Sequence, residues 1–327
     1  VIRFEKQVSM DDSPGADFGK NKVPAPPPSL AKHCIRLATA DDAGELIDLS
    51  FLTYRYSYAA DFYNKKLLQQ AIAKGMYEIT VLENEERIVG AYIIVHPESG
   101  EKWAEMGSAM VLPEYRATRA VMYLFRAMAR YMEENPHDCD FFTSHLVTTH
   151  TRSQKLLHKI KPPFIPLSLF PNMVPRPEFI GISKDSEGRE SLLWSFSMLQ
   201  PFRQDILYAP EQRHAMLRQL LDNTGFGNSV TLKEAFLGPT LSVSKFKVEH
   251  SDRQGFSIIR LENIGRDWFV ALAKQIITLI GSGIESVSVN IPTNSPLPPD
   301  METQLRSIGL FFSGIHMAAL DSLDLAY

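Results

Sequence analysis

The chain has 327 residues, of which 44% are hydrophobic and 22% are charged. This length favours about two domains, and the composition excludes a wholly disordered, collagen-like or coiled-coil chain. The formal net charge of −4 gives no general electrostatic reason to bind nucleic acid or an anionic membrane surface. The longest apolar stretch, residues 268–280, is shorter than the roughly 20 residues that span a bilayer. We therefore expect neither a nucleic-acid partner nor a membrane partner.

Cysteine usage indicates the compartment. Cys34 and Cys139 are too few for a disulfide framework and lie in no spacing typical of a zinc site. A cytoplasmic protein without a metal cofactor is the simplest interpretation. Cys139 follows His137 and Asp138, which leaves a thiol nucleophile open as an alternative, although neighbours in sequence rarely adopt the arrangement that nucleophilic catalysis needs.

Residues 1–30 are expected to form an N-terminal tail and a linker. Residues 10–30 are rich in proline and poor in large apolar side chains, so burial cannot offset the entropy cost of ordering them. The first eight residues alternate weakly, as a strand does, but no partner strand follows them directly. We interpret them as the end of an upstream domain.

From Ile35 onward, the periodicity predicts a regular series of elements. A strand at 35–38 leads to a helix that begins after Thr39, an expected N-cap. A second helix at 62–75 precedes a hairpin of two strands, 77–82 and 87–95. A strand at 103–112, a helix at 116–134, a strand at 141–148 and a helix at 150–159 complete this series. The order is that of a mixed α/β fold.

Six prolines between Lys161 and Pro177 are expected to exclude both a helix and a central strand, which leaves an extended crossing segment. A hairpin of strands 179–183 and 191–199 is predicted to follow. The second half is predicted to hold a helix from Pro210, strands 240–249 and 255–262, a helix at 267–280, a strand at 284–291, a helix at 298–308 and a strand at 311–315. This order repeats the latter part of the first series, so we expect a tandem of related α/β domains, 31–200 and 201–327.

The most informative segment is the strand, turn and helix at residues 105–125. A strand that runs through a short proline-containing turn onto a helix places free backbone N–H groups and the positive end of the helix dipole together. Arg116 and Arg119 add positive charge at this point. The junction therefore indicates a phosphate site, while the alternative is that both arginines only solvate a helix end.

The sequence Val-Leu-Pro-Glu-Tyr-Arg at 111–116, after a strand and before an amphipathic helix, resembles the pyrophosphate-binding segment of the GNAT acetyltransferase superfamily. The resemblance implies a GNAT-like acyl-CoA N-acyltransferase fold with acetyl-CoA or another acyl-CoA as co-substrate. Its donor contacts would come from Val111, Arg116, Ala117, Thr118, Arg119, Ala120 and Val121. The family has small residues where this chain has Arg119 and Val121, so close approach of the backbone to phosphate is in question.

A second resemblance lies at residues 148–156, where His150 and Ser153 match the Asn and Ala of a family helix motif. Ser153 would thereby join the donor site. Leu157 stands where the family often has a tyrosine that acts as the general acid. For the general base, Glu105 on the central strand, His145 and His150 are the candidates. The alternatives are a solvent-facing Glu105, a core His145 and a His150 that only begins a helix.

An aromatic cluster follows the first helix and either lines an acceptor pocket or packs in the core; its members are Tyr54, Tyr56, Tyr58, Phe62 and Tyr63. The wider pattern resembles a bacterial group of two-part GNAT-like proteins that are often fused behind an anti-sigma-factor-type ATPase domain. Two functions follow from these resemblances. One is acyl transfer to a small-molecule or protein amine, and the other is a catalytically inactive ligand-binding module coupled to a signalling domain.

Overall fold

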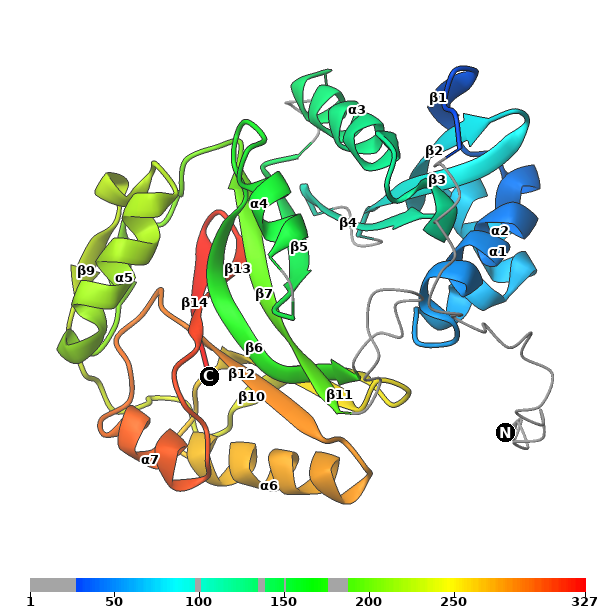
Figure 1. Ribbon diagram of the computed structural model, residues 1–327. Coiled ribbons are helices and arrows are strands. Elements are labelled where there is room, and N and C mark those ends of the chain that lie inside the picture. The colour runs from blue at the N-terminus through cyan, green and yellow to red at the C-terminus, as the bar shows by residue number, and fades with distance from the viewer. Residues whose placement is uncertain (1–27, 98–100, 135–138, 150, 176–187) are drawn as a thin grey trace, which may run out of the picture.

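The computed structural model describes residues 28–97, 101–134, 139–149, 151–175 and 188–327. These residues form a mixed α/β fold in which helices flank a 12-stranded sheet, and a two-stranded sheet lies apart from it (Figure 1). The tail and most of the linker predicted at 1–30, and the predicted strand 179–183, lie outside the described residues. None of the described helices is long and apolar enough to cross a membrane.

The first half of the described chain runs from β1 to β7, and its order of helices and strands from β1 to α4 is the one that the periodicity predicts. Its elements are β1 (His33–Leu37), α1 (Ala43–Tyr54), α2 (Lys65–Ala73), β2 (Tyr77–Asn84), β3 (Arg87–Val95), β4 (Trp103–Val111), α3 (Ala120–Glu134), β5 (Phe141–Val147), α4 (Arg152–Leu157), β6 (Ile165–Pro175) and β7 (Arg189–Met198). In the sheet their order is β1-β2-β3-β4-β5-β7-β6. All neighbours are antiparallel except β4 and β5, which are parallel.

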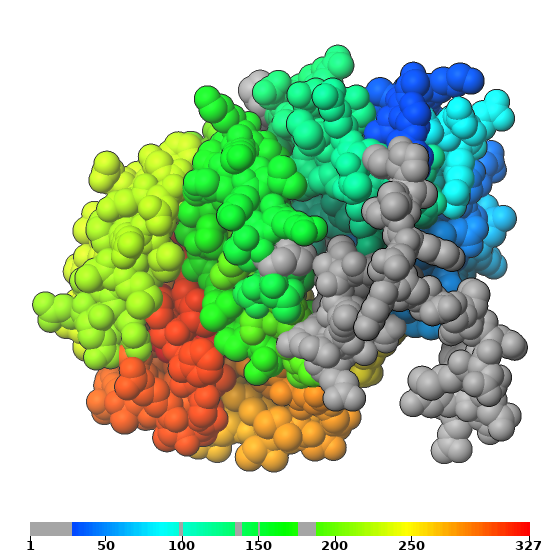
Figure 2. All heavy atoms as spheres, viewed as in Figure 1, coloured from blue at the N-terminus to red at the C-terminus, as the bar shows by residue number. Residues whose placement is uncertain are grey.

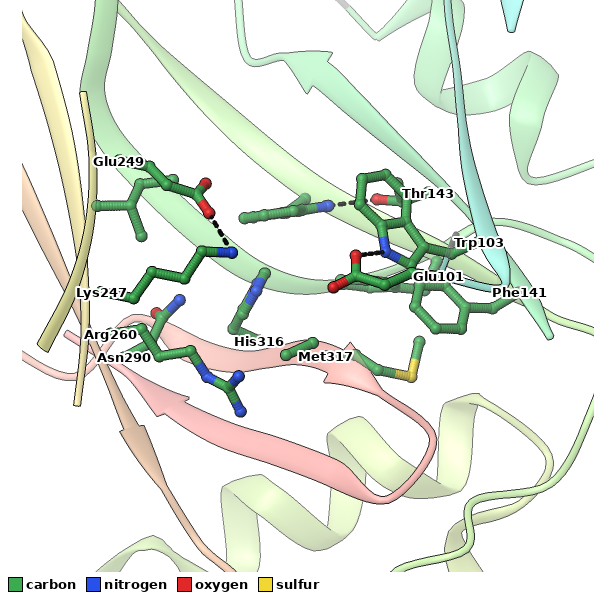
Figure 3. Close-up of a pocket in the computed structure, with 14 residues that line it drawn as sticks. Glu101, Trp103, Phe141, Thr143, Lys247, Glu249, Arg260, Asn290, His316 and Met317 are labelled. Carbon is green, nitrogen blue, oxygen red and sulfur yellow. Dashed lines mark hydrogen bonds and ion pairs between the residues drawn. The ribbon is translucent and has the colours of Figure 1, made fainter. Parts of the chain in front are cut away.

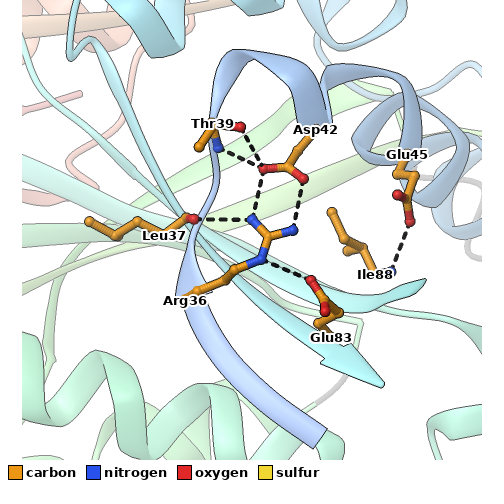
Figure 4. A network of polar contacts seen from close by, with 7 residues as sticks. All are labelled: Arg36, Leu37, Thr39, Asp42, Glu45, Glu83 and Ile88. Atoms are coloured by element: carbon orange, nitrogen blue, oxygen red, sulfur yellow. Dashed lines mark hydrogen bonds and ion pairs between the residues drawn. The ribbon is translucent and has the colours of Figure 1, made fainter. Parts of the chain in front are cut away.

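A polar network fastens the edge strand β1 to the start of α1 (Figure 4). The Arg36 guanidinium donates through Nη1 and Nη2 to the two carboxylate oxygens of Asp42, each at 2.8 Å, and through Nε to Glu83 on β2. Asp42 also accepts from the Thr39 backbone N–H, so the predicted capping position is occupied as expected. The bidentate hydrogen bonds from Arg36 lower the pKa of Asp42 to about 2 despite its partial burial.

Helix α3 begins at Ala120, four residues later than predicted. Residues 116–119 form a turn instead, because the Thr118 hydroxyl donates to the Tyr115 carbonyl and accepts from the Ala120 N–H. From there Ala120, Leu124, Met128 and Met132 recur every four residues and are buried. This apolar face packs against β2, β3 and β4.

The second half runs from β8 to β14. Its elements are β8 (Ile206–Tyr208), α5 (Glu211–Asn223), β9 (Thr231–Lys233), β10 (Lys245–Ser251), β11 (Phe256–Asn263), α6 (Trp268–Gly281), β12 (Ser286–Pro292), α7 (Met301–Ser307), β13 (Gly314–Ala319) and β14 (Ser322–Ala326). Its strand order β10-β11-β12-β14-β13 repeats the order β3-β4-β5-β7-β6. The parallel pair β11 and β12 corresponds to β4 and β5. Strands β8, β9 and β14 were not predicted.

The prediction that residues 161–177 hold no central strand is wrong. Residues 165–175 form β6, which lies between β7 and β13 inside the sheet. Two register shifts, between Pro166 and Ser168 and between Phe170 and Val174, interrupt its pairing with β7 near the prolines. On the other side β6 meets β13 at one register position only, Ser168 with Gly314. A strand with so few ladder hydrogen bonds tolerates residues that cannot donate one.

Two main hydrophobic cores fill the fold. One lies within the first half; the other fills the second half and also includes Phe141, Ile165 and Phe196 of the first, so it spans the join at β6 and β13, where the sheet is continuous. Figure 2 shows on its visible face that the C-terminal residues (red) lie directly beside the central residues (green). The two halves also face each other: residues of β4, β5 and β7 in the first half line one cavity together with residues of β10 to β13 in the second half.

Candidate functional site

A cavity lies where β4 and β5 separate. The two strands pair at three positions, from Trp103 with Phe141 to Glu105 with Thr143, and have no pairing beyond. The opening holds a cavity of about 160 Å³, here called the splay cavity. Its lining comes from both strands, α1, β3, α3 and α4, and consists of Tyr54, Tyr92, Met106, Gly107, Ser108, Ala109, Leu124, Phe125, Met128, Ser144, His145, Leu146, Val147, Ser153 and Leu157. Because β4 has no strand partner on this side, backbone groups of Met106–Ala109 are open to a ligand.

Glu105 and His145 meet at the point of separation. The distance from Glu105 Oε1 to His145 Nδ1 is 2.7 Å, and both side chains are partly exposed. Glu105 is the last paired residue of β4, and His145 lies two positions beyond the last paired residue of β5. Two of the three predicted base candidates are therefore brought together at the mouth of the splay cavity.

The surroundings favour the charged form of the Glu105 carboxylate. Burial by itself would raise the pKa of Glu105, but the positive charge and hydrogen bond of His145 outweigh it and hold the pKa below its usual value. A carboxylate that stays ionised beside an imidazole can accept a proton from a ligand. Space for a ligand is present, since a Cβ built on Gly107 would approach only Glu105 Oε1, at 3.9 Å.

Strand β4 bends at Ser108, which has φ of 56° and lies at a register shift opposite β3. The Tyr58 hydroxyl donates to the Ser108 hydroxyl and fixes this bulge. Tyr58 also stacks on Tyr54, with ring centroids 4.8 Å apart. Burial raises the pKa of Tyr54 to about 12. The core interpretation holds for Phe62, which is 2% exposed; Tyr54 is buried too but lines the splay cavity, and an acceptor pocket formed by this cluster stays a prediction.

The start of α3 offers free backbone donors. The N–H of Ala120 is bonded to Thr118, and the N–H of Thr118 to Tyr115. Within the described part of the chain, the N–H groups of the intervening and following residues have no acceptor: Ala117, Arg119, Val121 and Met122. Leu124, one helical turn after Ala120, lines the splay cavity. Free donors are therefore present at the place where an anion site is predicted, next to the cavity, and the site itself stays a prediction.

The two arginines of this segment have different surroundings. Arg119 is exposed, whereas Arg116 is half-buried and donates through Nε to the Val111 carbonyl at the end of β4, at 3.1 Å. Burial lowers the pKa of Arg116. Arg116 therefore holds the strand end in place, and both arginines lie in the turn before α3 instead of in the helix predicted to begin at residue 116. Val111 itself is 5% exposed and offers no side chain to a ligand.

Other predicted residues are placed as follows. Ser153 and Leu157 of α4 line the splay cavity. Leu157, which stands at the position where the resemblance implies a tyrosine, gives the cavity an apolar wall. His150, His137 and Asp138 lie outside the described residues. Cys139 is 5% exposed in the first core, so its thiol is not accessible as a nucleophile. The described residues hold no group of three or more His, Cys, Asp or Glu side chains that could bind a metal ion.

The equivalent strands of the second half do not separate in the same way. β11 and β12 pair at five consecutive positions, from Phe256 with Ser286 to Arg260 with Asn290. Arg260 and Asn290, which end this pairing, line a second cavity between the halves. Beyond this point Glu262, Asn263 and Pro292 line a further cavity, of about 300 Å³, so the second-half strands also separate, but after five paired positions instead of three.

No family model matches the sequence, and no curated protein matches it. Among solved structures, the ribosomal-protein-S18-alanine N-acetyltransferase from Escherichia coli is similar over 51% of this chain and 94% of its own, with 12% identity and a TM-score of 0.39. The PaiA N-acetyltransferase from Thermoplasma acidophilum, in complex with coenzyme A, is similar over 51% and 99%, with 12% identity and a TM-score of 0.36. The spermidine/spermine N-acetyltransferase SpeG from Vibrio cholerae, in mutant forms, is similar over 51% and 94%, with 12% identity and a TM-score of 0.40.

Proposed function

We propose that the chain is an acyl-CoA-dependent N-acyltransferase whose reaction takes place at the mouth of the splay cavity. The observation that carries this proposal is the Glu105–His145 pair, 2.7 Å apart, at the point where two parallel strands separate. The motif resemblance at residues 111–116 is independent of that geometry and points to the same chemistry. The acyl chain is taken to be short, because the splay cavity has a volume of only about 160 Å³.

The donor is assigned to the splay cavity and the start of α3. An acyl-CoA supplies a carbonyl activated by its thioester bond. The free N–H groups of Ala117, Arg119, Val121 and Met122 suit its pyrophosphate, because they combine hydrogen-bond donors with the positive end of a 15-residue helix. The exposed guanidinium of Arg119 would add an ionic contact in place of the small residue. The unpaired edge of β4 at Met106–Ala109 and the wall formed by Leu157 would border the acyl arm.

The acceptor is an amine, which must lose a proton before it can attack. Glu105 is placed to take that proton directly or through one water, and His145 keeps the carboxylate ionised and oriented. The nitrogen of the neutral amine then forms a bond to the carbonyl carbon, the carbon–sulfur bond breaks, and the nitrogen loses its second proton to water. The products are an amide and a thiolate, and a thiolate of ordinary pKa near 8.5 needs no strong acid to leave.

Negative charge that develops on the carbonyl oxygen needs a donor. Backbone N–H groups at the bulge of β4, around Ser108, are without a strand partner on the cavity side and are held in position by Tyr58. Such preorganised donors act strongly in a cavity with few waters. Turnover therefore does not require a general-acid tyrosine at position 157, where this chain has leucine.

The alternative is a catalytically inactive module that binds the same donor and reports to an attached signalling or ATPase domain. The residues that favour it are Arg119 and Val121, because their side chains can crowd a phosphate at the start of α3. Binding without turnover would support this alternative. A fused upstream domain stays a prediction from the sequence pattern.

The test begins with isothermal titration of acetyl-CoA, CoA and pantetheine into the purified chain. Acetyl-CoA and CoA are expected to bind with micromolar constants, and pantetheine more weakly because it lacks the pyrophosphate. A continuous assay of released CoA thiol with a set of primary amines then measures transfer. Absence of heat and of a thermal shift with acetyl-CoA would overturn the proposal, and binding with no thiol release from any amine would select the inactive module.

A further inference from the structure

A second cavity lies on the face of the sheet where the two halves meet. Its volume is about 150 Å³, which is of the size that holds a benzene-sized molecule in a protein interior. Its lining comes from β4, β5 and β7 of the first half, from β10 to β13 of the second half, and from residues beside β4 and β13. The lining residues are Glu101, Trp103, Phe141, Thr143, Trp194, Phe196, Lys247, Glu249, Ile258, Arg260, Asn290, His316, Met317 and Ala318 (Figure 3).

This inter-half cavity is next to the Glu105–His145 pair. Side chains alternate along a strand, so Thr143 and His145 lie on one face of β5, and Trp103 and Glu105 on one face of β4. The indole of Trp194 connects the two places. It contacts the His145 imidazole, with ring centroids 4.6 Å apart, and the His316 imidazole on β13, at 4.1 Å. A molecule in the cavity therefore has one end beside the proposed base.

Two buried polar groups in the cavity have no hydrogen-bond partner within the described residues: Asn290 Oδ1 and His316 Nδ1. Their residues are 1% and 8% exposed. Buried polar atoms without a partner cost free energy, and a ligand or water that bonds to them recovers it. Asn290 and His316 belong to β12 and β13 of the second half, so the end of the cavity formed by these strands is suited to a polar group of a ligand.

The charges at that end identify the group. Lys247 and Arg260 are direct cross-strand partners on β10 and β11, an arrangement that is unfavourable for like charges. Asp324 and Ser322 occupy Nε and Nη2 of Arg260, which leaves Nη1 without a partner among the described residues. The Lys247 ammonium pairs with Glu249 at 2.8 Å, and its side chain is 56% exposed. A carboxylate would separate the two cations and use the free guanidinium nitrogen.

The opposite end carries negative charge. Glu101 lies there, bonded to the Trp103 indole N–H at 2.7 Å, and Glu105 follows on β4. Figure 3 shows Lys247, Arg260 and Asn290 on one side of the cavity and Glu101, Trp103 and Thr143 on the other. The aromatic walls of Trp103, Phe141 and Trp194 lie along the path between these ends. At the Lys247 end, Glu249 and Asp324 match the two cations, so a carboxylate there would rely on the free Nη1 of Arg260, Asn290 and His316. At the other end Glu101 bonds, among the described residues, only to the neutral Trp103 indole, which suits a cationic amino group, so the lining complements a zwitterion.

We propose that the inter-half cavity binds the acyl acceptor, and that this acceptor is a small amine with a carboxylate several bonds from its amino group. The carboxylate lies between Lys247 and Arg260, with Asn290 and His316 as further polar partners, and the amino group points to Glu105. This inference rests on the proposed acyl transfer, since it assigns the acceptor of that reaction. It gives the second half a role in substrate selection.

The test compares three molecules of each chain length from two to six carbons: the ω-amino acid, the alkylamine and the diamine. Each is assayed for CoA release with acetyl-CoA. At one or more lengths, the ω-amino acid is expected to have a kcat/KM at least about tenfold above the alkylamine and the diamine, as expected for one charge-assisted contact. Equal values for the three molecules at every length would overturn the proposal.

Variants then locate the contact. Lys247→Glu is expected to remove the preference for the ω-amino acid over the alkylamine and to favour the diamine. Lys245→Glu is the matched control, because Lys245 lies on the same strand with a 70% exposed side chain and does not line the cavity. A preference that survives Lys247→Glu unchanged would contradict the assignment.

Failure of the two proposals can be told apart. If no amine releases CoA and acetyl-CoA does not bind, the proposed function fails, but the cavity can still be tested by ligand-observed NMR without a donor. In that experiment the ω-amino acid is expected to bind the unmodified chain and to lose at least about tenfold in affinity with Lys247→Glu. Binding that is equal in the unmodified chain and in Lys247→Glu would overturn the cavity assignment.

Discussion

Glu105 Oε1 lies 2.7 Å from His145 Nδ1 across the point where β4 and β5 separate, although the two residues are 40 positions apart in the sequence. The parallel pairing of only three residues on each strand places both side chains at one opening. This relationship unites an ionised carboxylate, an imidazole and a cavity, and it is the basis of the first two predictions.

Replacement of the carboxylate should remove most of the activity and little of the stability. Glu105→Gln keeps the side-chain size and a hydrogen bond to His145, but the amide cannot accept the amine proton. We expect kcat/KM to fall by about 10²–10⁴, the range of general-base contributions. Glu133→Gln, exposed on α3 and outside both cavities, is the control for the loss of one charge. Steady-state kinetics on the folded variants measure kcat/KM. A Glu105→Gln variant with full activity would exclude Glu105 as the base.

The pH dependence should follow from the partner of Glu105. The pKa of Glu105 is held below its usual 4.5, so its acid limb in kcat/KM is expected below pH 4.5. His145→Leu removes the charge and the hydrogen bond that lower this pKa, which leaves burial to raise it. The acid limb should therefore move to higher pH in the variant. A pH–rate profile measures this shift, and a limb that stays in place would show that His145 does not act on Glu105.

Two arginines before α3 should affect different properties: Arg119 the binding of CoA, and Arg116 the stability of the fold. Arg119→Ala should weaken CoA binding about fivefold by titration, as expected for one exposed ion pair, and leave the melting temperature unchanged. Arg116→Ala should lower the melting temperature, because it removes the hydrogen bond to the Val111 carbonyl at the end of β4. If Arg119→Ala binds CoA as tightly as the unmodified chain, the pyrophosphate does not lie at its side chain.

The join between the halves depends on a glycine. Gly314 pairs with Ser168 and has φ of 137°, and an added Cβ would lie 2.7 Å from Ser168 Cα. Gly314→Ala is therefore expected to destabilise the protein by at least about 2–3 kcal/mol in urea denaturation. Gly281→Ala, where nothing lies within 4 Å of the new Cβ, is expected to be neutral or slightly stabilising. Equal denaturation midpoints for the two variants would contradict the role of this contact.

His316 should make stability depend on pH. Burial, followed by the positive charges of Arg260 and His145, lowers its pKa from 6.5 to about 3. The unfolded chain therefore binds a proton that the folded chain does not, so stability is full above pH 6.5 and falls as the pH drops from 6.5 toward 3. Between pH 7 and pH 5 we expect a loss of about 2 kcal/mol. His316→Gln should lose less over the same range in urea denaturation, and an equal loss in both proteins would place the titrating group elsewhere.

The sequence by itself determined the order of helices and strands through β5 and most of the elements after β9. Apolar periodicity is a local signal, so it locates α3 and α6 and the strands between them. The strand, turn and helix at 105–125 likewise predicted free donors at the start of a helix. Local rules were wrong at the start of α3, where the Thr118 hydroxyl holds a turn, and at β6, whose prolines lie in a strand with interrupted pairing.

Only the tertiary structure decided which residues meet. Whether Glu105 faces solvent or His145 depends on where β4 and β5 cease to pair, and register is set by contacts between strands distant in the sequence. The inter-half cavity depends further on contacts between the halves, such as the pairing of Ser168 with Gly314 and the hydrogen bond from the Leu169 N–H to the Ser313 carbonyl, and Trp194 contacts His316 across it. No local pattern encodes these contacts, because they arise from the packing of two halves against each other. The chemistry of the site therefore resides in single residues, and their proximity comes from the fold.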